Sequence, residues 1–178
     1  MRKLKNSELN RPSLEEFKRL LKIPIVIVLD NIRSLNNIGS IFRTGDAFRI
    51  ECLHLCGITG TPPHRDIQKT ALGATESLKW IYFENILDSI ASLKKQHYKI
   101  VAVEQIDTSI DLTDFRPVLS DKYALVFGNE IKGISDEVLD FVDLGIEIPQ
   151  FGTKHSFNVA VSAGIVLWHI FYHLNLPA

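Results

Sequence analysis

Asn37 and Arg43 are the first side chains in this chain whose types and spacing could do chemistry. They lie in residues 36–43, an amide-rich stretch that follows an apolar run. Asparagine favours the N-cap of a helix, so we expect Asn37 to begin a helix and Arg43 to lie nearly two turns into it. Exposed amides at a helix start, together with a guanidinium, form a seat for phosphate. A capped helix with a surface arginine would give the same pattern.

Glu130 is the candidate carboxylate. It follows the apolar residues 123–127 and the pair Gly128 and Asn129. A carboxylate directly after a buried strand is costly unless it is paired or lies at the edge of a site. We therefore expect Glu130 to pair with Arg43 across the end of a sheet, the alternative being an exposed carboxylate in a turn.

Ser156 and Asn158 are the candidates in a third segment, residues 148–164, which ends in an apolar run rich in small residues. Either side chain could cap the helix that follows. Small residues allow another backbone to pack very close to that helix. A tightly packed core helix is compatible with the same pattern.

The motifs of several common enzyme classes are missing. No G-x-G-x-x-G follows the first strand, and no phosphate-binding G-x-x-x-x-G-K-[ST] occurs. No serine lies in the G-x-S-x-G of α/β hydrolases. The six histidines lack the spacing of a zinc site, so we expect no metal.

Strands and helices alternate along the chain. We expect strands at 25–29, 52–56, 79–83, 100–103, 123–127 and 144–148, and helices at 13–22, 37–48, 65–72, 85–96, 135–141 and 157–174. This alternation predicts an α/β fold with a mostly parallel sheet and helices on both faces. Ligands in such sheets bind beyond the carboxyl ends of the strands, which is where the three polar segments lie.

The charge is unevenly distributed between an N-terminal arm and the rest of the chain. Residues 1–22 carry seven basic and three acidic side chains, a net +4, and the remaining 156 residues carry a net −5. We therefore divide the chain into a basic helical arm, residues 1–23, and one domain, residues 24–178. A basic arm on an acidic body suggests an anionic partner, although a solvated terminal helix would have the same composition.

The overall composition, with 46% hydrophobic and 23% charged residues, is that of a globular protein. No apolar run of 18 residues occurs, so we expect no membrane span, and the N-terminus does not have the form of a secretory signal.

On one strand, Cys52, His54 and Cys56 would share a face, with the thiols roughly 13 Å apart, too far for a disulfide. Buried, reduced thiols favour a cytoplasmic location.

Taken together and in this order, the three segments resemble the motifs of the SpoU-type (TrmH-like) RNA ribose methyltransferases of the SPOUT class. The resemblance covers residues 24–174. Two positions depart from it, because the family more often has Leu at Phe157 and Met at Gln150. The resemblance implies a deep trefoil knot at about residues 123–174, which binds S-adenosylmethionine, and a homodimer.

The resemblance also implies roles for individual residues. The implied cofactor-binding positions are Val103, Glu104, Gly128, Asn129, Ile148 and Phe157, and the implied catalytic positions are Asn37, Arg43, Glu130, Ser156 and Asn158. In the mechanism proposed for the family, the matching arginine acts as the base. Because a guanidinium hardly loses its proton in proteins, we assign Arg43 first to positioning a phosphate and polarising a hydroxyl, and leave the base role open.

The implied reaction is methyl transfer to a ribose 2′-hydroxyl of RNA. The sequences of residues 128–130 and 148–150 resemble those of members that act on guanosine 18 in the D-loop of tRNA. The short length argues against ribosomal RNA members, and members acting at the tRNA wobble position remain a rival. Two alternatives come from other classes. One is a catalytically silent RNA-binding module, and the other is a phosphate-ester enzyme that uses Arg43 as a clamp.

Overall fold

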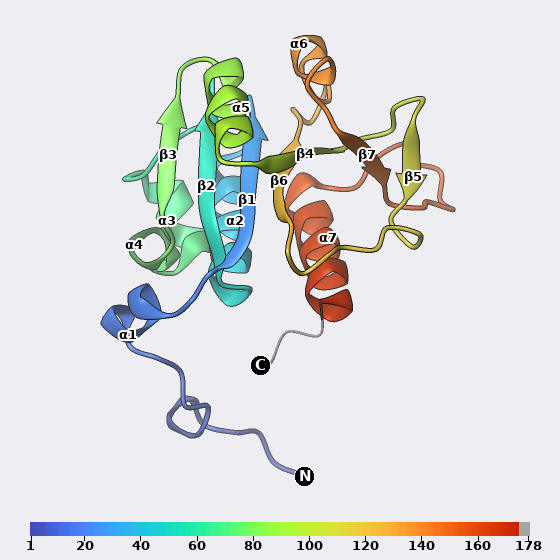
Figure 1. Cartoon of the computed structure of the whole chain (residues 1–178). Coiled ribbons are helices and arrows are strands. Elements are labelled where there is room, and N and C mark those ends of the chain that lie inside the picture. Colours follow the sequence, from blue (N-terminus) through green and yellow to red (C-terminus); the bar gives the residue numbers. More distant parts are fainter. Residues whose placement is uncertain (175–178) are drawn as a thin grey trace.

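A seven-stranded, wholly parallel sheet forms the centre of the molecule (Figure 1). The computed structural model describes residues 1–174, and residues 175–178 of the expected domain lie outside the described part. The order across the sheet is β3-β2-β1-β6-β4-β7-β5. The strands are β1 (Ile23–Asp30), β2 (Ile50–Cys56), β3 (Trp80–Phe83), β4 (Tyr98–Val103), β5 (Ser109–Asp111), β6 (Lys122–Phe127) and β7 (Leu144–Glu147).

The two central strands bring the first and second polar segments together. β1 and β6 are apolar runs that are buried on both faces, as expected of inner parallel strands. Their register pairs Leu29 with Phe127. The chain therefore leaves the sheet after Asp30 and after Phe127 at the same carboxyl edge.

Helices cover both faces of the sheet, so the predicted mostly parallel α/β class is confirmed. One core joins the sheet to α2 (Leu35–Ala47), α3 (Arg65–Ala71), α4 (Ala74–Ser77) and α7 (Val159–His173). A second core joins its other face to α5 (Ile86–Lys95) and α6 (Asp136–Leu139). In residues 1–174, no helix has the length and apolar character that a bilayer crossing needs.

The helix in the arm is shorter than the sequence pattern predicts. After the single turn η1 (Asn6–Glu8), α1 runs over Leu14–Arg19 behind a capping box of Ser13 and Glu16. We expected a helix over residues 13–22, ended by Pro24, but it ends at Arg19, and Pro24 belongs to β1. Only Phe17 of its apolar face is buried, whereas Leu21 is 89% exposed. The apolar face of α1 is too short to pack a longer helix against the rest of the protein.

The Cys52–Cys56 strand has the predicted common face. Both thiols are free and buried, and burial raises the pKa of each to about 12. His54 between them is buried too, with its Nδ1 2.7 Å from Ser89 Oγ on α5. Burial lowers the pKa of His54 to about 4. This face belongs to the core and is not a reactive site.

Candidate active site

The helix of the first segment begins earlier than predicted. Ser34, not Asn37, is the N-cap of α2, and its side chain accepts a hydrogen bond from the Asn37 amide at 3.3 Å. The assignment of Asn37 as N-cap was wrong because a second capping residue precedes it by one turn. The Asn37 side chain is thereby left available for contacts beyond its own helix.

Glu130 takes its partners from the start of α2, not from Arg43. Its carboxylate accepts hydrogen bonds from the Arg33 and Ser34 amides and from Asn37 Nδ2, each at 3.3 Å. The expected pairing of Glu130 with Arg43 is wrong, since the carboxylate lies over the free amides at the N-terminus of α2, where negative charge is favoured.

The pKa of Glu130 reflects two opposing influences. Burial, the largest single influence, raises it. Hydrogen bonds from the amides of Glu130 itself, Arg33 and Ser34, and from the Asn37 side chain, outweigh burial, so the pKa lies below its usual value. Because the carboxylate is ionised at neutral pH and already accepts several hydrogen bonds, Glu130 is suited to holding other groups in place rather than to taking up a proton.

Asn158 joins the third segment to the other two. It is the N-cap of α7, with its Oδ1 2.9 Å from the Ala160 amide. Its Nδ2 donates to Asn37 Oδ1 at 3.1 Å. A continuous chain of hydrogen bonds therefore runs from Asn158 through Asn37 to Glu130, and the three sequence segments meet as their motifs predict.

Arg43 lies apart from this chain of hydrogen bonds. Six residues separate it from Asn37, which places the two side chains on different faces of α2 at 3.6 residues per turn. Arg43 is exposed and lines a shallow hollow between α2 and α3 together with Lys69 and Thr70. Within one chain, the structure does not bring Arg43 to Glu130 or Asn158.

A cavity of about 100 Å³ lies beyond the carboxyl ends of β4, β6 and β7. Five of the six predicted cofactor-binding residues line it, namely Val103, Glu104, Gly128, Ile148 and Phe157. Ser156 lines it as well. One wall is formed by segment 150–157, which is exposed apart from the half-buried Gln150, and Gln150 and His155 of this segment also line the cavity.

Asn129, the sixth predicted cofactor residue, is not among the lining residues of this cavity. Its Nδ2 donates to the Asn31 carbonyl at 2.7 Å, and its Oδ1 accepts from the Ile131 amide at 3.0 Å. Asn129 and Gly133 also exchange main-chain hydrogen bonds. The structure thus gives Asn129 the task of folding residues 128–134 into a compact loop.

Gly128 is required by that loop. A Cβ there would collide with the main chain of Gly133 and Ile134, where the loop doubles back. Only a residue without a side chain, glycine, therefore fits at position 128, between the cavity on one side and the returning loop on the other.

Eight residues that line the cavity were not predicted as site residues from the sequence, namely Gln105, Phe127, Ile146, Glu147, Gln150, His155, Val159 and Ser162. Ser162 lies one helical turn after Asn158, a spacing that could have indicated it. Gln105 follows Glu104 beyond the end of β4, and that position was also a usable signal. In residues 1–174, no group of three or more His, Cys, Asp or Glu side chains is arranged to hold a metal ion.

A family model described as the SpoU rRNA Methylase family matches residues 24–168. The chain belongs to this family. The match includes all three segments and excludes the arm, so the predicted resemblance is confirmed.

Curated relatives of this SpoU chain are named for two kinds of RNA. It is 31% identical over 166 residues to a tRNA (guanosine(18)-2′-O)-methyltransferase of Thermus thermophilus, covering 91% of this chain and 81% of that protein. It is also 31% identical over 159 residues to the 23S rRNA (guanosine-2′-O-)-methyltransferase RlmB of Neisseria meningitidis, covering 89% of this chain. The match spans 62% of the length of RlmB.

Solved structures of SpoU members share the fold. An A. aeolicus TrmH/SpoU tRNA modifying enzyme superposes with a TM-score of 0.80 at 24% identity, covering 91% of this chain and 81% of the other. An AdoMet-bound rRNA methyltransferase from Sinorhizobium meliloti has a TM-score of 0.80 at 26% identity, covering 89% of this chain and 60% of that one.

Proposed function

We propose that this chain transfers a methyl group from S-adenosylmethionine to a ribose 2′-hydroxyl of RNA. The observation that carries the proposal is the hydrogen-bonded chain Asn158–Asn37–Glu130, which lies where the three SpoU segments meet. Family membership adds the reaction class, and relatives named as 2′-O-methyltransferases support it.

The residues around the cavity fit the proposed cofactor. Val103, Ile148 and Phe157 offer apolar surface for an adenine, and the Glu104 carboxylate offers acceptors for hydroxyl or amino groups. The cavity of about 100 Å³ is smaller than the roughly 300–1,000 Å³ of small-molecule sites. We infer that the exposed segment 150–157 moves outward when the cofactor binds. Bound S-adenosylmethionine supplies a methyl group on a sulfonium, which an oxygen nucleophile can attack.

The polar residues then position the RNA. Asn37, held by Asn158 and Glu130, presents its side chain at the start of α2 beside the cavity. Ser156 on the cavity wall contributes a hydroxyl. Together they hold the ribose against the methyl group, a gain from proximity. Arg43 binds a phosphate and polarises the 2′-hydroxyl as its proton leaves.

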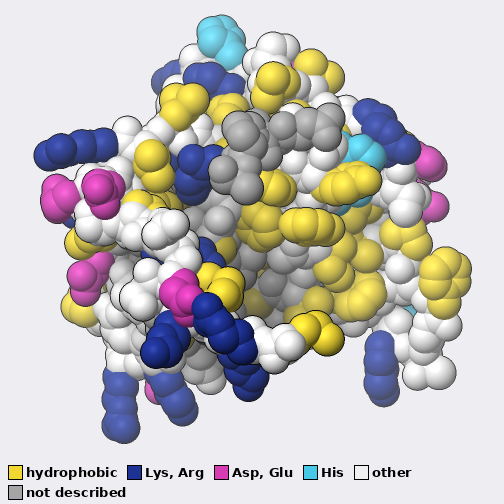
Figure 2. All heavy atoms as spheres, turned by 90° about the horizontal axis from the view of Figure 1, so that it is seen from below, with side chains coloured by type: hydrophobic (Ala, Val, Ile, Leu, Met, Phe, Trp, Pro, Cys, Tyr) yellow, Lys and Arg dark blue, Asp and Glu magenta, His cyan; other side chains and the backbone are white. Residues whose placement is uncertain are grey.

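A homodimer completes the site in this proposal. Arg43 lies in a hollow away from the cavity, so a second copy of the chain must supply the arginine that faces each cavity. Apolar side chains on α7 support this, because Val161, Trp168 and Tyr172 are 50%, 58% and 64% exposed. Figure 2 shows hydrophobic side chains gathered around a hollow on the face that carries the arm.

A knot, an RNA-binding arm and a location also belong to the proposal. A trefoil knot over residues 123–174 fits the path of β6, which enters the sheet between β1 and β4 after the chain has already formed β5 at its edge. The contact of His169 Nε2 with the Phe115 carbonyl at 2.8 Å fits a C-terminal helix that passes close to the crossing segment. The basic arm, residues 1–23, is proposed to bind RNA, and the location is cytoplasmic.

We favour tRNA, modified at guanosine 18, as the substrate. The relatives named for tRNA and for rRNA are equally similar at 31% identity, so the preference depends on the forms of residues 128–130 and 148–150. Ribosomal RNA and the tRNA wobble position are the alternatives.

Calorimetry with S-adenosylmethionine, followed by transfer of a labelled methyl group to unmodified tRNA and rRNA, tests the proposal. We expect saturable cofactor binding and 2′-O-methylation that maps to a single nucleotide. RNA binding without cofactor binding would identify a silent module and would overturn the proposed activity. Methylation of rRNA alone would overturn only the choice of substrate.

A further inference from the structure

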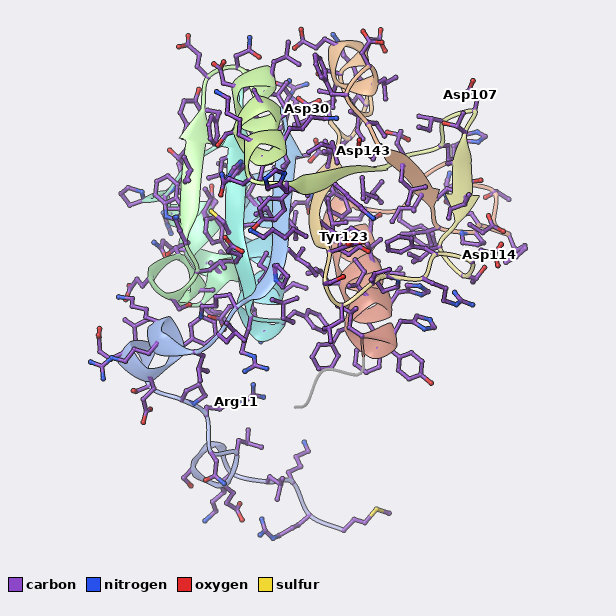
Figure 3. All side chains as sticks on the ribbon, in the orientation of Figure 1. Arg11, Asp30, Asp107, Asp114, Tyr123 and Asp143 are labelled. Atoms are coloured by element: carbon purple, nitrogen blue, oxygen red, sulfur yellow. The ribbon has the colours of Figure 1, made fainter. Side chains whose placement is uncertain are left out.

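A second hollow, of about 560 Å³, lies on the far side of the 128–134 loop from the cofactor cavity. The first segment contributes Asn31 and Arg33 to its lining, and the second segment contributes residues 129 and 131–136. Ile58, from the loop after β2, completes it. Asp30, at the carboxyl end of β1 in Figure 3, marks its place in the fold.

The floor of this hollow is held by polar side chains that are satisfied internally. Buried Asp30 accepts hydrogen bonds from the Ser135 amide and from Asn31 Nδ2, each at 2.7 Å. Asn31 Oδ1 accepts from the Ile58 amide at 3.1 Å. Asn129 Nδ2 donates to the Asn31 carbonyl. The segments that follow β1 and β6 are thereby fixed to each other, and the hollow has a defined shape at the edge of the site.

The groups left at the rim are apolar and basic. Ile58 and Ile131 are 66% and 78% exposed, although both are large aliphatic side chains. Arg33 and Lys132 are exposed as well, and Asp136 is the single carboxylate among the lining residues. The rim therefore has a formal net charge of +1 on a body whose residues 23–178 carry −5.

The hollow is directly connected to the catalytic chain of hydrogen bonds. The Arg33 amide donates to Glu130, whose carboxylate is not among the lining residues of the hollow. A group bound at the rim would thus lie one loop away from the residues that hold the target ribose.

We propose that this hollow binds a single-stranded nucleotide of the RNA next to the one that is methylated. Its base packs against Ile58 and Ile131, and a neighbouring phosphate binds Arg33 and Lys132. Apolar surface with adjacent cations is the chemistry that binds an unstacked base and its backbone. A volume of about 560 Å³ falls within the range of roughly 300–1,000 Å³ for sites of small organic ligands. The inference rests on the proposed function, because it assigns a subsite of that RNA.

Steady-state methyl transfer to an unmodified tRNA transcript tests the subsite in Lys132→Glu and Ile131→Ser. Lys95→Glu, on the exposed end of α5, is the matched control for the charge change, and Leu72→Ser, 66% exposed, is the control for the loss of apolar surface. We expect each test variant to raise KM for tRNA by about tenfold. The controls should leave KM within about twofold of wild type, and kcat and cofactor affinity should stay unchanged throughout.

The outcomes separate this proposal from the proposed function. If wild type methylates tRNA but Lys132→Glu and Ile131→Ser match their controls in KM, the subsite is wrong and the function stands. If wild type methylates neither tRNA nor rRNA, the function fails, and cross-linking of a 4-thiouridine-substituted tRNA decides the subsite. Cross-links to the peptide that holds Ile131 would support it, and their absence would overturn it. A changed oligomeric mass in Ile131→Ser would assign the surface to a second copy of the chain instead and would overturn it as well.

Discussion

Asn158 Nδ2 donates a hydrogen bond to Asn37 Oδ1 at 3.1 Å, although the two residues lie 121 positions apart in the chain. The same Asn158 begins α7 by accepting from the Ala160 and Val161 amides. One asparagine therefore uses its oxygen to start a helix and its nitrogen to position a candidate catalytic residue. These two tasks can be separated by substitution.

Asn158→Asp should keep the fold and lose activity. Aspartate caps a helix about as well as asparagine, but its carboxylate has no N–H to donate to Asn37. We expect the free energy of unfolding to change by less than about 0.5 kcal/mol and turnover to fall at least about tenfold. Asn158→Ala should lose turnover and, in addition, about 1 kcal/mol of stability with the cap. Urea unfolding measures the change in stability, and methyl-transfer assays measure the turnover. Full turnover in Asn158→Asp would show that the hydrogen bond to Asn37 is not needed.

Arg43→Ala should abolish methyl transfer and leave the affinity for S-adenosylmethionine within a few-fold of wild type. Arg43 does not line the cofactor cavity, whereas loss of a contact that stabilises charge in a transition state lowers the rate about 100-fold or more. Arg43→Lys, which keeps the charge but not the planar fork, should recover only part of the rate. Calorimetry and turnover are the measurements. A rate above about a tenth of wild type in Arg43→Ala would contradict the assigned role.

A charge reversal on α1 should weaken RNA binding without affecting the cofactor. Phe17 on α1 is buried, so deletion of the arm would uncover apolar surface. Lys18→Glu combined with Arg19→Glu avoids this, because both side chains are exposed. We expect a higher Kd for tRNA and a shallower salt dependence, since each phosphate contact contributes about −0.9 to the slope on B-DNA and about −0.7 on single strands. Lys95→Glu is the control, and an unchanged slope in the double variant would identify the arm as a solvated helix.

Trp168→Glu should convert the proposed dimer into a monomer. Trp168 is 58% exposed on α7 and stacks on Phe171 with ring centroids 6.2 Å apart. A carboxylate in the middle of a buried apolar contact is costly. Light scattering at micromolar concentration should give twice the chain mass for wild type and the chain mass for the variant. The monomer should also lose methyl transfer, because Arg43 of a second copy no longer reaches the cavity. A monomeric wild type would contradict the prediction.

Acid should destabilise the fold through His54. Because burial lowers the folded-state pKa of His54 from its usual 6.5 to about 4, the native state favours the neutral ring. The stabilisation is complete above pH 6.5 and is lost as the pH falls through the folded pKa, and it amounts to about 3 kcal/mol at most. Urea unfolding between pH 7 and pH 4 should show a smaller loss in His54→Asn than in wild type. Parallel pH profiles in the two proteins would exclude His54 as the cause.

The sequence pattern was sufficient for six of the seven strands, for the helices on both faces other than α4, and for the meeting of the three segments. Continuous apolar runs such as residues 25–29 identify inner strands, and the carboxyl ends of parallel strands share an edge. The pattern failed where several residues suit the same position. Ser34 and Asn37 are both good helix caps, and only the fold shows that Ser34 is used.

Other features depend on contacts that no local pattern contains. β5 has three residues in a polar stretch and exists because it pairs with β7. The partners of Glu130 depend on how residues 128–134 fold back over Gly128. The direction in which Arg43 points depends on which face of α2 packs on the sheet, and that face carries the buried Ile38, Ile41 and Phe42.

The position of β6 between β1 and β4 has a consequence for synthesis of the chain on the ribosome. Until residue 127 has emerged, β1 and β4 have no strand between them, and each presents an open edge of unpaired amides and carbonyls. The centre of the sheet is therefore filled late and by distant residues, which is the kind of topology that folds slowly. During that interval the growing chain exposes its most apolar strands, so this is the stage at which aggregation or a chaperone would compete with folding.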